Sequence, residues 1–343
     1  MGLPDTPVVV SRSHDPYFNL AVEEWLLRGH VGATFQLFLY CNRPTVVLGR
    51  NQNPWLESPV AALPEWGVAL ARRISGGGAV YHDPGNLNLA LLGPRHLYEP
   101  ERHLQLVREA LQRFGLQADT GNRHSLFVQG RKLTGSAFML TGRAALQHAT
   151  LLVSADLQRL ERCLRGRVVG ARTHAQASVR APVGNLSTFL SGVSPKTMAT
   201  AIVEAFRTRY TADWQQAPTL VPQLAAAQDP DLHGYLAKQR SRAWTFGHTP
   251  VFTQTLCGQL PVGAVELELE VREACVCRVE FRCVSCPAPL ARRVEATLQG
   301  EFYDGHRLAA KVRRLEAQGP DAGGWLAGLG DWLAGAVAPG DSD

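Results

Sequence analysis

The sequence predicts an α+β fold with a large first domain and a small second one. Strand-like and helix-like segments are mixed along the chain, without the regular strand–helix alternation that produces a parallel α/β sheet. A chain of 343 residues is long enough for one large domain and one small domain, each with its own core. A polar segment at 238–241 is the predicted connection, so we expect domains over 1–243 and 249–343.

In the first domain, apolar segments separated by turn residues predict strands. Residues 35–40 and 45–48 are rich in residues that favour strands, and Asn-Arg-Pro at 42–44 is the predicted turn between them. Two further strands are predicted at 68–71 and 87–92. These four segments are the first part of the expected sheet.

Helices and hairpins follow. Apolar residues recur at helical spacing over 104–114, and Gly115 stands where a C-terminal cap is favoured. Residues 126–134 have the pattern of a hairpin with its turn at Gln129-Gly130, and Thr-Gly-Arg at 141–143 separates two more strands. The remaining helices predicted in this domain lie at 157–164 and, opened by Ser-Pro, at 194–210.

A long segment without periodicity, 166–184, contains three arginines and is predicted to be a functional loop. The second domain has strand patterns between 251 and 284, followed by helices that begin near Pro287 and Tyr303. The apolar stretch 325–337 is interrupted by an aspartate and by glycines, which is typical of a packed terminal helix.

Composition narrows the class of protein. Lys and Arg number 35 against 30 Asp and Glu, a net charge of +5 that does not indicate a nucleic-acid surface, since no basic cluster is interleaved with aromatic residues. No apolar run approaches the roughly 20 residues that span a bilayer. We therefore expect neither nucleic acid nor membrane as a partner, and we expect a monomer.

Seven cysteines, an odd number, are scattered along the chain, which indicates reduced thiols. Cys275, Cys277, Cys283 and Cys286 form CxC and CxxC pairs that leave a zinc site open as an alternative. The alternation over 265–281 instead predicts a strand with Cys275 and Cys277 on one core face. We favour structural thiols and expect no metal site.

The most informative segment is 72–88, RRISGGGAVYHDPGNLN. Three consecutive glycines let a backbone approach another group closely, and Arg72 and Arg73 favour an anion such as phosphate. The spacing is neither that of a P-loop nor that of a dinucleotide fingerprint, so a bulge between two strands stays open. His82 and Asp83 face opposite ways on a strand, which favours a structural role over an acid–base pair.

This segment resembles the signature of the lipoate–protein ligase and lipoyltransferase family. Further motifs occur in the family's order: NLAVEEW at 19–25, VVLGRNQN at 46–53, KLTGSA at 132–137, HATLL at 148–152, SVR at 178–180, NL at 185–186 and WTFG at 244–247. The similarity covers nearly the whole chain. Within the family, GARTHAQAS at 170–178 is most similar to animal mitochondrial lipoyltransferase.

The resemblance implies a mixed sheet with packed helices, as in biotin–protein ligases, in a lipoyl- and adenylate-binding catalytic domain followed by an accessory domain. Lys132 is the implied catalytic residue, placed where the acyl oxygen and the phosphate gain negative charge. Arg123 stands in a motif that lacks the family's usual acid, which puts its role in doubt. The residues implied to bind lipoyl-adenylate are Arg72, Arg73, Ser75, Gly76, Gly77, Gly78, Ala79, Val80, Tyr81, Arg123, Ser136, Ala137, His148, Thr150, Ser178 and Arg180. Leu20, Val46, Val80 and Ala137 are expected to line an apolar slot for the lipoyl chain.

The family's activity implies transfer of lipoyl groups to a specific lysine of lipoyl domains. These domains belong to the acyltransferase subunits of 2-oxoacid dehydrogenases and to the glycine-cleavage H protein. The donor is lipoyl-adenylate (lipoyl-AMP) or a lipoylated protein, or lipoate with ATP, and with Mg²⁺, if the enzyme activates lipoate itself.

Two other functions stay open: octanoyl transfer through an acyl-cysteine at Cys163, and a scaffold that binds lipoyl domains without transfer. The resemblance implies the mitochondrial matrix. The first 30 residues, with two basic and four acidic side chains, do not have the pattern of a transit peptide.

Overall fold

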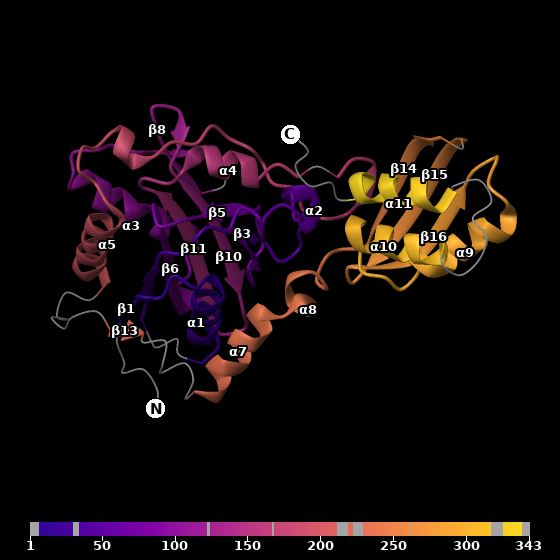
Figure 1. The fold of residues 1–343 in the computed structure, drawn as a ribbon. Helices are drawn as coiled ribbons and strands as arrows, with labels where there is room; N and C mark the ends of the chain where they lie inside the picture. Colours follow the sequence, from indigo (N-terminus) through magenta and orange to yellow (C-terminus); the bar gives the residue numbers. More distant parts are fainter. Residues whose placement is uncertain are drawn as a thin grey trace. The chain divides into compact units, whose positions relative to one another are not determined.

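The computed structural model describes residues 7–29, 34–121, 124–166, 168–210, 219–221, 229–261, 263–316 and 325–337. Two compact units are built from several segments each (Figure 1). The first comprises 1–50, 67–162 and 178–241, and the second comprises 51–66, 163–177 and 242–343. The second unit therefore takes in two short segments, 51–66 and 163–177, that lie well before its main stretch in the sequence.

The first unit is organised around a six-stranded sheet in the order β10-β11-β6-β2-β1-β13. Strand β1 is parallel to both of its neighbours and the remaining pairs are antiparallel, so the sheet is mixed, as expected of this α+β chain. Its strands are β1 (Val8–Ser11), β2 (Gln36–Tyr40), β6 (Asn86–Pro94), β10 (Thr134–Leu140), β11 (Ala144–Leu152) and β13 (Thr219–Val221).

Helices cover both faces of this sheet (Figure 1). Ala149 and Leu151 of β11 join the main core with residues of α3 (Pro100–Gln112) and α5 (Pro195–Tyr210). Because successive side chains of a strand alternate, His148 and Thr150 point to the opposite face, where α1 (Pro16–Gly29) packs on β6 and β11. The candidate site lies on this second face.

Two small sheets complete the first unit, in the orders β4-β3-β5 and β7-β8-β9. Gly130 and Gly115 have positive φ angles, as the predicted hairpin turn and helix cap require. The remaining elements are β3 (Thr45–Leu48), β4 (Ala69–Arg72), β5 (Val80–His82), β7 (Asp119–Gly121), β8 (Ser125–Val128), β9 (Arg131–Lys132), α4 (Leu157–Cys163), α7 (Pro230–Arg240) and the 3₁₀ turns η1 (Arg95–Leu97) and η2 (Leu186–Thr188).

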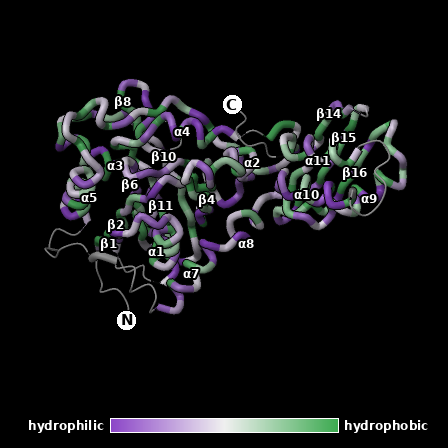
Figure 2. The backbone as a smooth tube through the Cα atoms, viewed as in Figure 1, coloured by the Kyte–Doolittle hydropathy of each residue, from purple (hydrophilic) through white to green (hydrophobic). Residues whose placement is uncertain are grey.

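The second unit is a four-stranded antiparallel sheet in the order β12-β14-β15-β16, with helices packed on one face. Figure 2 shows hydrophobic and hydrophilic positions alternating along its strands, as a sheet with one buried face requires. The elements are α2 (Pro54–Glu57), β12 (Ala171–Thr173), α8 (Arg242–Thr245), β14 (Phe252–Leu260), β15 (Gly263–Arg272), β16 (Cys275–Arg282), α9 (Ala288–Leu298), α10 (Gly305–Glu316) and α11 (Trp325–Ala336).

Trp55 explains why the segment 51–66 belongs to this unit. Its indole is buried, with ring centroids 5.6 Å from Phe246, 5.8 Å from Phe252 and 4.8 Å from Tyr303. Aromatic clusters of this kind contribute to packing beyond the area that they bury.

One sequence prediction in this unit is wrong. The pattern over 265–281 belongs to two strands, β15 and β16, joined by a two-residue turn in which Glu273 and Ala274 have φ angles of 50° and 63°. Such turns usually contain glycine or asparagine, so this one left no signal in the sequence. The buried position in β16 is that of Val276, and Cys275 and Cys277 are half-buried on the other face.

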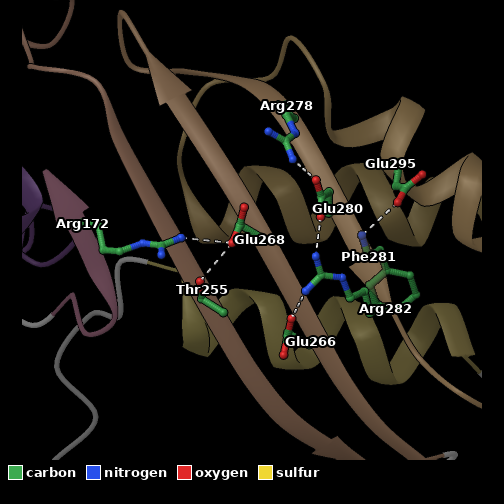
Figure 3. Close-up of polar contacts among 9 residues, drawn as sticks. All are labelled: Arg172, Thr255, Glu266, Glu268, Arg278, Glu280, Phe281, Arg282 and Glu295. Atoms are coloured by element: carbon green, nitrogen blue, oxygen red, sulfur yellow. Dashed lines mark hydrogen bonds and ion pairs between the residues drawn. The ribbon is translucent and has the colours of Figure 1, made fainter.

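The other face of this sheet is polar. Figure 3 shows arginine and glutamate side chains paired on this face: Arg282 contacts Glu266 of β15 at 2.5 Å and Glu280 of its own strand at 2.6 Å, and Arg172 of β12 contacts Glu268 of β15 at 3.3 Å. Ion pairs that are this exposed contribute little to stability. Within the described ranges, no helix is long and apolar enough to span a membrane.

Candidate functional site

The predicted glycine run forms the connection between β4 and β5. Gly77 has a φ angle of 85°, in the left-handed region that favours glycine. A Cβ on Gly49 would lie 2.1 Å from the carbonyl oxygen of Gly77, and the amide of Arg50 donates to the carbonyl of Ser75 at 2.8 Å. The glycine loop, residues 73–79, is thus held against the segment that follows β3, so it is more than a bulge in one strand.

Both arginines before the glycines are buried and hold backbone carbonyls. Arg72 donates from Nη1 to the carbonyls of Gly49 and Arg50, each at 3.0 Å. Arg73 donates from Nη2 to the carbonyls of Gly76 and Gly78, each at 2.7 Å. Burial lowers the pKa of each guanidinium to about 10, so both stay charged at neutral pH.

A chain of hydrogen bonds runs from Arg73 to helix α1. Arg73 Nε donates to Ser75 Oγ at 3.0 Å, and Ser75 Oγ lies 2.7 Å from His148 Nε2. His148 Nδ1 lies 2.8 Å from Glu23 Oε1, and the Tyr40 hydroxyl donates to Glu23 Oε2 at 3.3 Å. All five residues are less than 9% exposed, so each contact is made in a low-dielectric environment.

The Ser75 hydroxyl links the guanidinium to the imidazole. A guanidinium can only donate, so the Ser75 oxygen accepts from Arg73, and it is also hydrogen-bonded to His148 Nε2. The other ring nitrogen, His148 Nδ1, is hydrogen-bonded to the Glu23 side chain. The imidazole is therefore held on both of its nitrogens.

The glycine loop lies over the edge strand β10. A Cβ on Gly77 would be 3.2 Å from Ala137 Cβ, and one on Gly135 would be 3.7 Å from Val80 Cγ1. Thr150 accepts a bond from the Gly135 amide at 3.1 Å. Ser136 pairs with Ala149, so its side chain lies on the opposite face, with the main core. The structure thus brings Val80, Ala137 and Thr150 together, but not the Ser136 hydroxyl.

Ser178 contacts the C-terminal part of the glycine loop. Its hydroxyl accepts from the Ala79 amide at 2.8 Å, and a Cβ on Gly78 would meet Ser178 Oγ at 2.8 Å. Arg180, two residues on, is exposed. The predicted Arg123 lies outside the described residues.

Lys132 is positioned by its backbone. It is half-buried at the end of β9, where its amide donates to the carbonyl of Pro182 at 2.8 Å and its carbonyl accepts from Gly184 at 3.1 Å. These bonds tie it to the segment that follows Ser178. Three residues later the chain reaches Gly135 in β10, opposite Thr150.

His82 and Asp83 contact neighbouring residues of the fold, and their structural role stays a prediction. The His82 ring lies 2.9 Å from Asn42 Nδ2, and burial together with the charge of Arg73 lowers its pKa to about 3. Asp83 accepts from the amides of Gly85 and Asp156 at 2.9 and 2.8 Å. Tyr81, between the site residues and this pair, is 2% exposed.

Sequence reasoning missed Glu23, Tyr40 and Gly49 as site residues. Glu23 and Glu24 are adjacent in a mostly apolar helix, and both are 1% exposed. A buried carboxylate needs partners, so two successive glutamates in such a helix were a usable signal. Of the expected slot residues, Leu20 and Val80 share a small apolar cluster with Val47.

The described cysteines form no disulfide bond. Among the described residues, no group of three or more His, Cys, Asp or Glu side chains is arranged to hold a metal ion. Cys163 is fully buried, and its carbonyl accepts from the Ser58 hydroxyl at 2.8 Å.

Comparisons with known proteins identify the class of protein to which this mixed sheet and glycine loop belong. The family model described as the lipoyl protein ligase A/B catalytic domain matches residues 15–207. A Psychrobacter cryohalolentis protein named lipoate-protein ligase A is 34% identical over 331 residues, which are 96% of this chain and 98% of that protein. The chain belongs to the lipoyl protein ligase A/B family and is a lipoyl-transferring enzyme.

Solved structures share the fold. The P. falciparum protein LipL1, in complex with lipoate, has a TM-score of 0.63 at 22% identity, covering 96% of this chain and 99% of that one. A bipartite lipoate protein ligase from Thermoplasma acidophilum, described with its E2 lipoyl domain, has 0.57 at 22%, covering 69% and 95%. A lipoate-protein ligase A bound with ATP has 0.54 at 24%, covering 67% and 92%. The α+β fold is confirmed, whereas the particular similarity to the animal mitochondrial enzyme stays a prediction.

Proposed function

We propose that this enzyme transfers a lipoyl group to a specific lysine of lipoyl domains, from lipoyl-adenylate or from a lipoylated protein. The observation that carries the proposal is the glycine loop, which buried Arg73 holds over the sheet face of His148 and Thr150. Loop amides freed of side chains are suited to surround a phosphate. Ser178 accepts a hydrogen bond from the Ala79 amide of the loop and so lies beside the proposed phosphate site.

Lys132 supplies the positive charge in this proposal. The amine of the target lysine attacks the lipoyl carbonyl, an amide bond forms, the acyl–phosphate bond breaks, and AMP leaves with its electron pair while the amine loses a proton. Charge develops on the carbonyl oxygen and on the phosphate, where a fixed cation stabilises it. The remaining expected ligand contacts, from Gly76 to Tyr81 and at Ala137 and Thr150, are part of the same proposal.

Activation of lipoate with ATP, and with Mg²⁺, is the second candidate, because one solved relative of the fold is a lipoate-protein ligase A bound with ATP. Transfer from an adenylate and synthesis of that adenylate place the same charge demands on Lys132. We expect lipoyl domains of 2-oxoacid dehydrogenases and the glycine-cleavage H protein as acceptors, in the mitochondrial matrix.

The proposal is tested by offering the enzyme an apo lipoyl domain with one donor at a time and weighing the domain. We expect a gain of one lipoyl group with lipoyl-adenylate. A gain with free lipoate and ATP, accompanied by pyrophosphate release, identifies the full ligase reaction. A domain whose mass is unchanged with lipoyl-adenylate, lipoylated H protein, and lipoate with ATP contradicts the proposal.

A further inference from the structure

Arg73, at one end of the buried hydrogen-bond chain that begins at Glu23, holds the glycine loop in place. Arg73 uses three of its nitrogens on the loop region: Nη2 holds Gly76 and Gly78, Nη1 holds the carbonyl of Val47 at 3.0 Å, and Nε holds Ser75. The guanidinium therefore sets the path of the glycine loop. The orientation of the guanidinium depends in turn on the position of Ser75, which accepts from Arg73 Nε.

Ser75 is held from the other side by the His148 ring, which Glu23 orients. His148 Nε2 lies 2.7 Å from Ser75 Oγ, and His148 Nδ1 lies 2.8 Å from Glu23 Oε1. A carboxyl group hydrogen-bonded to one ring nitrogen fixes the orientation of the ring and with it the position of the other nitrogen. Two other titratable groups lie near this contact. Burial lowers the pKa of His82 to about 3, and the Tyr40 hydroxyl, whose pKa burial raises well above its ordinary value, donates to the other oxygen of Glu23.

We propose that Glu23 is a positioning residue for lipoyl transfer: through His148 and Ser75 it orients Arg73 and with it the glycine loop. The proposal rests on the proposed function and adds a residue of α1 to it. Serine, histidine and glutamate in this order also have the geometry of a nucleophilic triad. Positioning is favoured because Ser75 is 0% exposed and its oxygen accepts a bond from a guanidinium, which makes it a weaker nucleophile.

The neighbouring residue provides a matched control. Glu24 is as buried as Glu23, but its carboxylate pairs with Arg28 at 2.8 Å and with Lys238 of α7 at 2.8 Å, away from the loop. We expect Glu23→Met to lower the single-turnover rate at saturating lipoyl-adenylate by about 10- to 100-fold, in line with a displacement of about 1 Å at a reacting centre. Glu24→Met is expected to lower the melting temperature and leave this rate unchanged.

Two further measurements separate positioning from packing. Glu23→Gln keeps an acceptor for His148 Nδ1 and is expected to recover most of the rate. In a Ser75→Ala background, Glu23→Met should have almost no additional effect, since residues that act through one chain are not additive. Effects that multiply in the double variant, or equal loss with Met and Gln, overturn the proposal. If Glu23→Met does not fold, Tyr40→Phe, which removes one bond to the carboxylate, replaces it in the same cycle with a smaller expected loss.

Hydrogen exchange keeps this test independent of activity. Amides of residues 73–80 should exchange faster in Glu23→Met than in the wild type, and at the wild-type rate in Glu24→Met. Unchanged exchange in Glu23→Met, or an acyl mass trapped on Ser75 of the wild type, contradicts the positioning role. A wild type that transfers nothing while loop exchange responds as expected contradicts the proposed function alone.

Discussion

Gly49 and Gly77 approach each other so closely that a single methyl group at Gly49 would collide with the backbone. The added Cβ would lie 2.1 Å from the Gly77 carbonyl oxygen and 3.1 Å from that of Gly76. Backbone atoms cannot rotate away as a flexible side chain can. The path of the glycine loop is therefore set by a residue 28 positions earlier in the chain.

Gly49→Ala should reduce lipoyl transfer on the order of 100-fold while the protein stays folded, because a shift of about 1 Å in a positioned loop has an effect of that size. The transfer rate from lipoyl-adenylate and the melting temperature are the measurements. Gly142→Ala, in a turn where an added Cβ has nothing within 4 Å, is the matched control. A Gly49→Ala enzyme as active as Gly142→Ala would show that the loop tolerates displacement.

Folding stability should fall on acidification because of His82. Its pKa is about 3 in the folded protein and about 6.5 when unfolded, so below pH 6.5 the unfolded chain takes up a proton that the native state excludes. The loss is about 1.4 kcal/mol per pH unit, or roughly 2 kcal/mol at pH 5, and it continues down to about pH 3.

Urea unfolding at pH 7 and pH 5 checks this prediction. The His82→Asn variant, which keeps an acceptor for Asn42 but cannot take up the proton, should lose less stability than the wild type between the two pH values. His96→Asn, at an exposed position, should behave like the wild type. Equal pH dependence in all three proteins would mean that His82 does not stay neutral.

Cys163→Ser distinguishes the two transfer chemistries. We expect the variant to keep most of its activity, at a cost of about 1–3 kcal/mol in stability for placing a hydroxyl at a fully buried position. Cys41→Ser is the comparison, at a half-buried thiol whose pKa burial raises to about 11. A folded but inactive Cys163→Ser enzyme, with an acyl-thioester mass on the wild type, would establish an acyl-cysteine route.

The fold was largely predictable because its elements carry strong local signals. The hairpin turn at Gly130, the cap at Gly115 and the Ser-Pro start of α5 are where turn and capping chemistry place them. The Glu273-Ala274 turn was not predictable, because neither residue is typical of positive φ.

The site was predictable in part. The glycine loop and Lys132 stand in contiguous motifs, whereas Glu23 reaches His148 across 125 positions. That contact depends on the packing of α1 on β11, which no local pattern encodes. Ser136 is a residue that the sequence motif predicts in the site but that the structure does not bring there. It pairs with Ala149 in the sheet, so its side chain faces the main core.

The central claim is lipoyl transfer by a site in which Lys132 supplies charge. The most direct measurement is the rate at which wild type and Lys132→Ala move the lipoyl group from lipoyl-adenylate to an apo lipoyl domain, read by mass, with melting temperatures measured in parallel. We predict rapid transfer by the wild type and a loss on the order of 100- to 1000-fold in the variant at nearly unchanged stability, since the side chain is only half-buried. A Lys132→Ala enzyme that transfers at the wild-type rate, or a wild type that does not transfer at all, would contradict the account.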